Sequence, residues 1–179
     1  MKQPFKIDLQ SIKTKAREHI LQGAVTENYS ADREAVIKVL NDVLATELVC
    51  NLRYRNNALV AHGIHAEAVA AEFTEHATQE QDHADRIAAR IVQLGGEPNM
   101  DPASLTARSH ADYKTSRDIR ELLRENLIAE RVAVDTYAEI ARWLGEDDPT
   151  TRRLIEEILE QEEEHADDLA SLLEGQHAE

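Results

Sequence analysis

The sequence predicts an all-α protein, a single bundle of four long helices with one long connection. Ala, Leu, Glu and Arg dominate the 179 residues, while Gly (6), Pro (4) and aromatic residues (4%) are scarce. This composition is typical of long helices rather than of turn-rich sheets. Apolar residues also recur at spacings of three and four in four separate segments. With 42% hydrophobic residues the chain can bury one core, and its length argues against a second large domain.

The four long helices follow an N-terminal arm, residues 1–30, which contains a short helical pattern of its own. Ser30 or Asp32 can cap the first long helix, because a short polar side chain can accept a hydrogen bond from the first turn. The pair Gly95–Gly96 ends the second long helix and Gly145 ends the third. The predicted helices cover about residues 32–62, 65–94, 116–144 and 149–173, so that the bundle occupies residues 31–174 and a short tail residues 175–179.

A long connection separates the second helix from the third. The stretch "EPNMDPASLTARSHADY" contains two prolines and has no sustained apolar period, so it is predicted to be irregular. The other two connections are short, and they define two αα-hairpins. The long link can travel the length of the bundle, which would place the third helix antiparallel to the first.

The formal charge of −15 favours the attraction of cations and argues against nucleic-acid binding by the folded body. Plain solubility is the alternative explanation of this acidity. The first 17 residues depart from the trend and could contact phosphate groups. In this segment a lone Asp8 faces five basic residues: Lys2, Lys6, Lys13, Lys15 and Arg17.

The single cysteine, Cys50, excludes an intrachain disulfide framework. No apolar run approaches the roughly 18–20 residues that would span a bilayer. The N-terminal segment "MKQPFKIDLQ" also lacks the apolar region of a secretory signal. We therefore expect a cytoplasmic protein without a membrane segment.

A glutamate interrupts the apolar stripe of every long helix near its middle. One such residue is readily explained as a charge at the edge of an apolar face that reaches water. Four at matching depth are harder to explain in this way, since buried carboxylates repel one another and lose hydration unless cations compensate. We therefore expect positive charge among these glutamates, which are Glu47, Glu80, Glu130 and Glu162.

Two of these glutamates begin an E-x-x-H motif. Glu80 with His83, and Glu162 with His165, are spaced so that each pair lies on one helix face. Imidazole nitrogen together with carboxylate oxygen suits iron, manganese or zinc rather than calcium or magnesium. Four carboxylates and two imidazoles, divided over two cations, predict a dinuclear centre with shared carboxylates and open coordination positions. Each hairpin supplies one half of this centre.

Several neighbouring residues have roles that the sequence leaves open. Tyr54, Tyr137 and Asn126 either hydrogen-bond to the ligands or pack with their polar groups satisfied elsewhere. Glu75 and His76 either pass metal to the centre or have an ordinary surface role. The acidic residues that we expect to face solvent are Asp85, Glu163, Glu164 and Asp167.

With these residues identified, the chain resembles the bacterioferritin branch of the ferritin-like superfamily over residues 32–173. The segments "LNDVLATELVCNLRY", "EQDHADRIAARIVQLGGEPN", "ENLIAERVAVDTYAEI" and "LIEEILEQEEEHADDL" resemble its four helix signatures in order. The resemblance implies ferroxidase activity. Two Fe(II) per subunit would be oxidised by O2 or H2O2, and Fe(III) would be stored inside a protein shell. It assigns the terminal ligands of one iron to Glu47 and His83, those of the other to Glu130 and His165, and the bridges to Glu80 and Glu162.

The chain departs from bacterioferritins in three respects. Bacterioferritins bind haem through a methionine, and this chain has Gln81 at the corresponding position. Its only methionines are Met1 and Met100, which argues against haem. The chain ends 14 residues after His165, which leaves no room for a fifth helix. It also carries the arm, and these last two features resemble the twelve-subunit Dps (DNA-protection-during-starvation) cages. Many such relatives carry a cysteine pair, which the single Cys50 cannot supply. A homo-oligomeric cage of about twelve subunits is favoured, and a dimer or a twenty-four-subunit cage stays open.

Two other functions compete with storage. A non-storing di-iron peroxidase or oxidase would resemble rubrerythrin, although this chain lacks the paired cysteines of an attached electron-transfer site. A Dps-type DNA-protecting protein would rely on the basic arm, but the acidic body argues against it.

Overall fold

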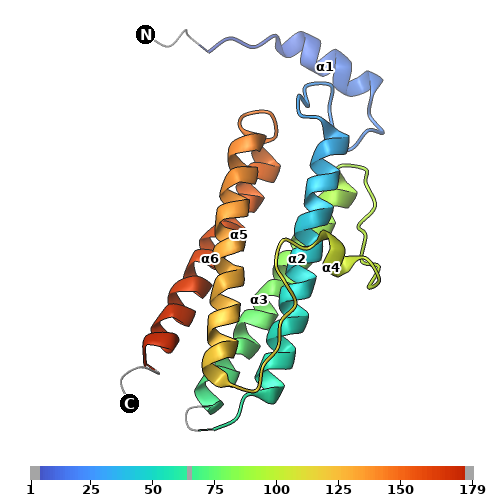
Figure 1. Cartoon of the computed structure of the whole chain (residues 1–179). Helices are drawn as coiled ribbons and strands as arrows, with labels where there is room; N and C mark the ends of the chain where they lie inside the picture. Colours follow the sequence, from blue (N-terminus) through green and yellow to red (C-terminus); the bar gives the residue numbers. More distant parts are fainter. Residues whose placement is uncertain (1–4, 64–65, 176–179) are drawn as a thin grey trace.

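The structure is a computed structural model that describes residues 5–63 and 66–175, and the described residues form helices and no strands. Four of the helices are long and lie side by side as a bundle (Figure 1). This confirms the predicted all-α four-helix bundle. The helices are α1 (Leu9–Glu18), α2 (Arg33–Val60), α3 (Ala66–Gln93), α4 (Leu105–Arg108), α5 (Ile119–Leu144) and α6 (Pro149–Gly175).

Side-chain caps and left-handed glycines determine where the long helices begin and end. The carboxylates of Asp32 and Asp118 each accept a hydrogen bond from the backbone N–H three residues on, at 3.2 and 2.9 Å. Gly95 and Gly145 follow α3 and α5 with φ of 83° and 51°, a conformation that side chains disfavour. Asp118 explains why α5 begins three residues later than expected. The predicted start of the second helix at His65 lies outside the described residues.

The connection between α3 and α5 runs along the bundle to its opposite end, as Figure 1 shows. The third long helix, α5, is therefore antiparallel to α2. Sequence periodicity did not predict α4 within this link, because a helix of four residues is too short to show a period. Leu105 of α4 is buried and packs against Ala45 and Val49 of α2. This contact fastens the link to the bundle.

The core consists of two apolar layers, one toward each end of the bundle. One layer combines the start of α2 and α6 with the end of α3 and α5, and it includes Leu40, Leu44, Ile87, Ile91 and Ile155. The other combines the opposite halves and includes Phe73, Leu122, Leu123 and Leu169. The four interrupting glutamates lie between these layers. A polar section is thereby enclosed above and below by hydrocarbon.

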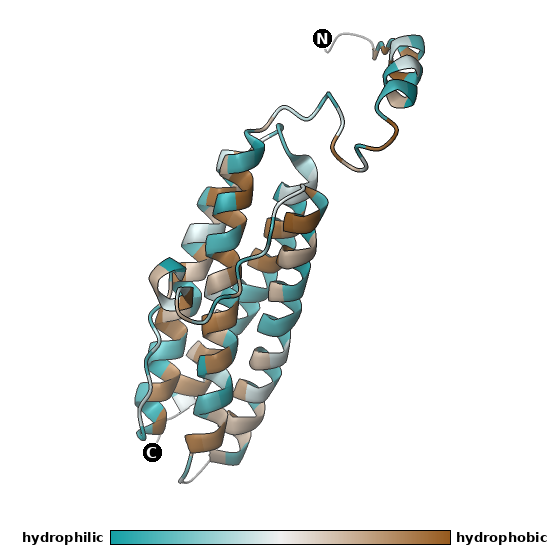
Figure 2. Cartoon of the chain, turned by 90° about the vertical axis from the view of Figure 1, so that its right-hand side faces the viewer, coloured by the Kyte–Doolittle hydropathy of each residue, from teal (hydrophilic) through white to brown (hydrophobic). Residues whose placement is uncertain are grey.

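The arm is attached to the bundle at one end only. Helix α1 has no buried residue and is set apart from the four long helices (Figure 2). Farther along the arm, Val25 and Tyr29 pack against the core, and the Tyr29 hydroxyl donates to Asp148 Oδ2 at 2.8 Å. The division into arm, bundle and tail stays a prediction. No helix among the described residues is both long and apolar enough to cross a membrane.

Candidate metal centre

The six side chains of the predicted centre come together in the polar section of the bundle. Each is at most 2% exposed, so water has little access to any of them. The four long helices all contribute, because each brings its interrupted stripe to the bundle axis. The residues are Glu47 of α2, Glu80 and His83 of α3, Glu130 of α5, and Glu162 and His165 of α6.

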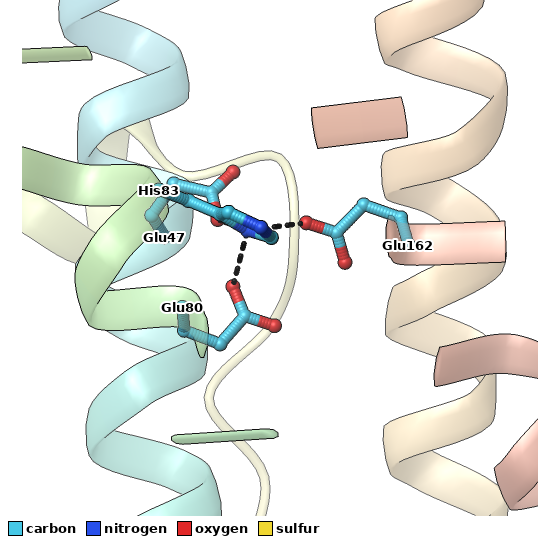
Figure 3. Close-up of side chains that lie close together, drawn as sticks. All are labelled: Glu47, Glu80, His83 and Glu162. Carbon is cyan, nitrogen blue, oxygen red and sulfur yellow. Dashed lines mark hydrogen bonds and ion pairs between the residues drawn. The ribbon is translucent and has the colours of Figure 1, made fainter. Parts of the chain in front are cut away.

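These side chains form two overlapping groups, and in each the potential ligand atoms lie within 4.8 Å of one another. Figure 3 shows the first group, in which Glu162 points across the bundle toward the three residues from α2 and α3. Glu80 and Glu162 belong to both groups, as expected of bridging carboxylates. The first group is Glu47, Glu80, His83 and Glu162; the second is Glu80, Glu130, Glu162 and His165.

The geometry around the two imidazoles leaves Nδ1 of each facing the carboxylates. His83 Nδ1 lies 3.1 Å from Glu162 Oε1 and 3.2 Å from Glu47 Oε2. His165 Nδ1 lies 3.3 Å from Glu162 Oε2 and 3.6 Å from Glu80 Oε1. Both nitrogens thus share the space into which the carboxylate oxygens point. Each could serve as a nitrogen ligand without a change of helix position.

Several of these atoms make no hydrogen bond among the described residues, although they are fully buried and some lie at ion-pair distance from one another. A buried carboxylate oxygen without a partner costs free energy, which a bound cation would recover. The atoms without partners also belong to both ligand groups. This donor set, four carboxylates and two imidazoles with open valences, fits a pair of divalent transition-metal ions. The atoms are Glu80 Oε1, Glu130 Oε2, Glu162 Oε1 and Oε2, and His165 Nδ1.

The pKa values of several of these groups are raised, so that without cations the site holds protons. Burial alone would lower the pKa of His165, but contacts with Glu162 and Glu80 raise it to about 10. Burial likewise opposes the charge on His83, and contacts with Glu162 and Glu47 raise its pKa. Burial and the charge of Glu80 raise the pKa of Glu47 to about 7.

The pKa values of the shared and the unshared glutamates are shifted in opposite directions. Burial, followed by the charge of Glu162, raises the pKa of Glu130 well above its usual range. Burial also opposes ionisation of Glu80 and Glu162, but contacts with the two histidines lower the pKa of both. The shared carboxylates are therefore the ones that stay ionised, which is the state required of a bridge between cations.

Two tyrosines hydrogen-bond to glutamates across the bundle. The Tyr54 hydroxyl of α2 donates to Glu130 Oε1 of α5, and the Tyr137 hydroxyl of α5 donates to Glu47 Oε1 of α2. Both phenols are fully buried. Each therefore orients an unshared carboxylate and leaves its second oxygen for the centre. The sequence left open whether these tyrosines hydrogen-bond to the predicted ligands or pack with their hydroxyls satisfied elsewhere. In the structure they hydrogen-bond to the predicted ligands.

Asn126 instead hydrogen-bonds to a buried arginine, Arg53, which the sequence did not identify as a neighbour of the site. Its Oδ1 accepts from Arg53 Nε at 2.9 Å, and Arg53 also donates from Nη1 to the backbone oxygen of Asp112 at 3.0 Å. The guanidinium carbon lies 5.8 Å from the centre of the Tyr54 ring. Arg53 thus places a fixed positive charge behind the tyrosine and fastens the long link to α2.

Two glutamines that hydrogen-bond to the histidines, Gln79 and Gln161, were also not predicted from the sequence. His83 Nε2 donates to Gln161 Oε1 at 2.8 Å, and His165 Nε2 donates to Gln79 Oε1 at 2.6 Å. Each amide comes from the opposite hairpin, and each donated proton leaves Nδ1 free to bind metal. Gln79 and Gln161 each precede the glutamate of an E-x-x-H motif. The repeated five-residue pattern Q-E-x-x-H was the signal that could have identified them.

The remaining neighbours are divided between surface and core. Glu75 is exposed, whereas His76 is buried and its ring stacks on that of His165 with 4.0 Å between centroids. An ordinary surface role for His76 is therefore wrong. Burial lowers the pKa of His76 to about 3, and the charge of His165 adds to this effect. The acidic residues predicted to face solvent are exposed: Asp85, Glu163, Glu164 and Asp167.

The fold and the site define a class of protein, the long four-helix bundles that enclose carboxylates from all four helices and imidazoles from two of them. The family model of the ferritin-like domain matches residues 37–176 of this chain. The chain therefore belongs to the ferritin-like family, which confirms the resemblance inferred from the helix segments.

Known proteins of two branches are similar to the chain. The DNA protection during starvation protein of Pyrococcus furiosus is 30% identical over 159 residues, which cover 84% of this chain and 83% of that protein. The structure of the bacterioferritin-related protein of Bacteroides fragilis, described as a dodecameric thioferritin, has a TM-score of 0.80 and 36% identity. That match covers 83% of this chain and 90% of the other. The bacterioferritin of Desulfovibrio desulfuricans, whose structure is described with a diiron site, has a TM-score of 0.70 and 26% identity, over 79% of this chain and 80% of that one.

Proposed function

We propose that the protein is a ferroxidase that oxidises Fe(II) with O2 or H2O2 at a centre holding two iron ions per subunit. The observation that carries the proposal is the sharing of Glu80 and Glu162 by both ligand groups. Two carboxylates common to both groups can hold two cations side by side at a fixed separation. The similarity to a bacterioferritin described with a diiron site supports iron as the metal.

The residues of this chain would bind and orient the metal while excluding water. His83, with Glu47, would hold one ion, and His165, with Glu130, the other. When bound, the iron pair supplies two electrons to one oxidant. The apolar layers on either side of the centre keep it dry, so that the carboxylate–cation attraction is not weakened by solvent.

Proton release accompanies cation binding in this proposal. The imidazole of His165 has a pKa raised to about 10 and the carboxyl of Glu47 one raised to about 7, so both hold protons over part of the neutral range. A cation takes the place of these protons, because the ligand atoms must be free of them. The Nε2 protons of the histidines stay with the two glutamines and keep the rings in place.

The test replaces both shared carboxylates by amides of the same shape. A Glu80→Gln, Glu162→Gln double variant should lose rapid Fe(II) oxidation, followed by stopped-flow absorbance, while its helical circular dichroism is kept. Glu163→Gln, an exposed neighbour of Glu162, is the matched control and should oxidise iron at the wild-type rate. If the double variant oxidised Fe(II) at the wild-type rate, the assignment of Glu80 and Glu162 as bridging ligands would be refuted.

We also propose that the oxidised iron is stored in a homo-oligomeric cage, with twelve subunits favoured. The dodecameric description of the Bacteroides fragilis protein supports this assembly. Native mass spectrometry before and after aerobic Fe(II) loading gives both the subunit number and the mineral content. A dimer that gains only a few irons would instead favour the non-storing peroxidase or oxidase.

Haem and DNA have no part in the proposed function. The Gln81 amide donates a hydrogen bond to Asp85 Oδ1 at 3.0 Å, and it offers no thioether to a haem iron. The charge of −15 opposes DNA binding, and retention of DNA by the oligomer at moderate salt would contradict this part of the proposal.

A further inference from the structure

A second cluster of potential ligands lies beside the dinuclear centre and is separate from it. His76 of α3 is 1% exposed, and its Nε2 lies 3.2 Å from Glu72 Oε1 and 3.9 Å from Asp168 Oδ2. The potential ligand atoms of these three residues lie within 4.8 Å of one another. None of the three belongs to either group of the dinuclear centre.

The position of this cluster follows from helix geometry. Glu72 and His76 precede Glu80 by eight and four residues on α3, and Asp168 follows His165 by three on α6. These spacings keep all of them on the faces where α3 and α6 meet. The cluster is therefore about one helical turn from the centre on each helix.

The buried imidazole of His76 lacks the hydrogen bonds that a purely structural histidine would have. Neither Nδ1 nor Nε2 has a hydrogen-bond partner among the described residues, despite the closeness of Glu72. Leaving such a group unsatisfied costs free energy, and packing alone would be served as well by a phenyl ring. The ring is also held in a fixed plane, since it stacks on His165 and meets the edge of Tyr54 at 89°.

The two carboxylates of the cluster are open to solvent on one side. The side chain of Glu72 is 30% exposed and that of Asp168 is 57% exposed. Burial, followed by the nearby charge of Asp168, raises the pKa of Glu72. One buried nitrogen and two solvent-facing oxygens suit a divalent transition-metal ion that keeps some of its water.

We propose that His76 Nε2, Glu72 and Asp168 bind a third divalent transition-metal ion, outside the dinuclear centre. The ion would be taken from solvent by the two carboxylates and held by the buried imidazole. Its place next to the His165 ring makes it a supply site for the centre; this role, unlike the binding itself, rests on the proposed function.

Anaerobic Co(II) binding to the full oligomer tests the site without iron oxidation. Isothermal titration and the visible absorption of bound Co(II) should give three ions per subunit. Anomalous scattering from a Co(II) crystal should place the third at His76. The Glu72→Gln, Asp168→Asn double variant should bind two, both in the centre. The matched control, Glu75→Gln with Asp167→Asn, removes the same charge from exposed positions on the same helices and should still bind three.

Other outcomes would overturn the proposal in distinct ways. Two ions in the wild type, or three in the double variant, would show that the cluster binds nothing. Equal loss in the control would show that the third ion is held only by general negative charge. A single ion at His76 that disappears in the double variant, in a protein whose centre binds no ions, would support this site and contradict the proposed function. For the supply role, Fe(II) oxidation by the double variant should slow at limiting iron and recover at saturating iron; an unchanged rate would refute that role alone.

Discussion

Tyr54 on α2 donates a hydrogen bond to Glu130 on α5, and the same relationship is repeated in reverse by Tyr137 and Glu47. Each hairpin therefore orients the unshared carboxylate of the other. The two hydrogen bonds join α2 and α5 in opposite directions. They also couple the candidate centre to the packing of α2 against α5.

Removal of one of these hydroxyls should destabilise the metal-free protein. Tyr54→Phe leaves a buried oxygen of Glu130 without a donor, at a cost of about 1–3 kcal/mol in the free energy of unfolding. Urea denaturation with and without Zn(II) measures the effect, which should shrink when zinc is bound. Tyr113→Phe, at an exposed tyrosine, is the control and should change stability little. A Tyr54→Phe protein as stable as the wild type would contradict the structural importance of this hydrogen bond.

The two glutamines should determine metal affinity rather than folding. Gln161→Leu removes the acceptor of the His83 Nε2 proton, so the ring is no longer held in one orientation. By analogy with other groups that orient metal ligands, affinity should fall about 10- to 100-fold. Competition with a Zn(II) chelator measures it. Gln81→Leu, on the outer face of α3, is the control, and equal losses in both variants would contradict the orienting role.

Metal stabilisation should increase as pH rises. The pKa of Glu47 is raised from 4.5 to about 7 and that of His165 from 6.5 to about 10. The folded metal-free chain thus holds more protons than the unfolded chain, so the stability contributed by these groups is full at low pH and is lost as pH rises through the raised values. Cation binding gains over the same interval because fewer protons must leave.

Scanning calorimetry with and without Zn(II) tests this dependence. The rise in Tm caused by zinc should be larger at about pH 8 than at about pH 6. The same rise at both pH values would contradict the assigned proton-holding groups.

Asp148 should be important for stability, and it belongs to neither ligand group of the candidate centre. Its Oδ1 accepts from the backbone N–H of Thr151 at 2.9 Å, which caps α6, and from Arg90 at 2.9 Å. Asp148→Ala removes the cap and leaves a largely buried guanidinium, so it should cost about 2–4 kcal/mol. Asp147→Ala, at the exposed neighbour, should cost much less, and both variants should keep the Fe(II) oxidation rate. Equal effects of the two variants on the urea midpoint would contradict this role.

The loss of stability at acidic pH should depend on the same residue, Asp148. Burial alone would raise the pKa of Asp148, but hydrogen bonds from Thr151 and Tyr29 hold it below 3.8. Its stabilising contribution is therefore present above this value and is lost as pH falls through the lowered pKa. The wild type should accordingly lose more stability on acidification than Asp148→Ala does, which urea midpoints across the acid range would measure.

The four long helices and the six residues that meet in their middle follow from the amino-acid sequence alone. Helix periodicity is a local property, so a glutamate that replaces a leucine in an apolar stripe, such as Glu130, has to face the bundle axis. The paired E-x-x-H motifs place His83 and His165 at the same depth for the same reason. The convergence of all six side chains follows from these spacings once the helices pack; their role as metal ligands stays a proposal.

Which helices exchange hydrogen bonds across the centre depends instead on how the helices pack against one another. The contacts of Gln79 with His165 and of Tyr54 with Glu130 join residues 86 and 76 positions apart, and they depend on the rotation and offset of helices from different hairpins. The burial of His76 has the same origin, because the stacking ring of His165 comes from α6. Spacing along one helix states which face a side chain occupies, whereas its partner is set by how closely the neighbouring helix approaches.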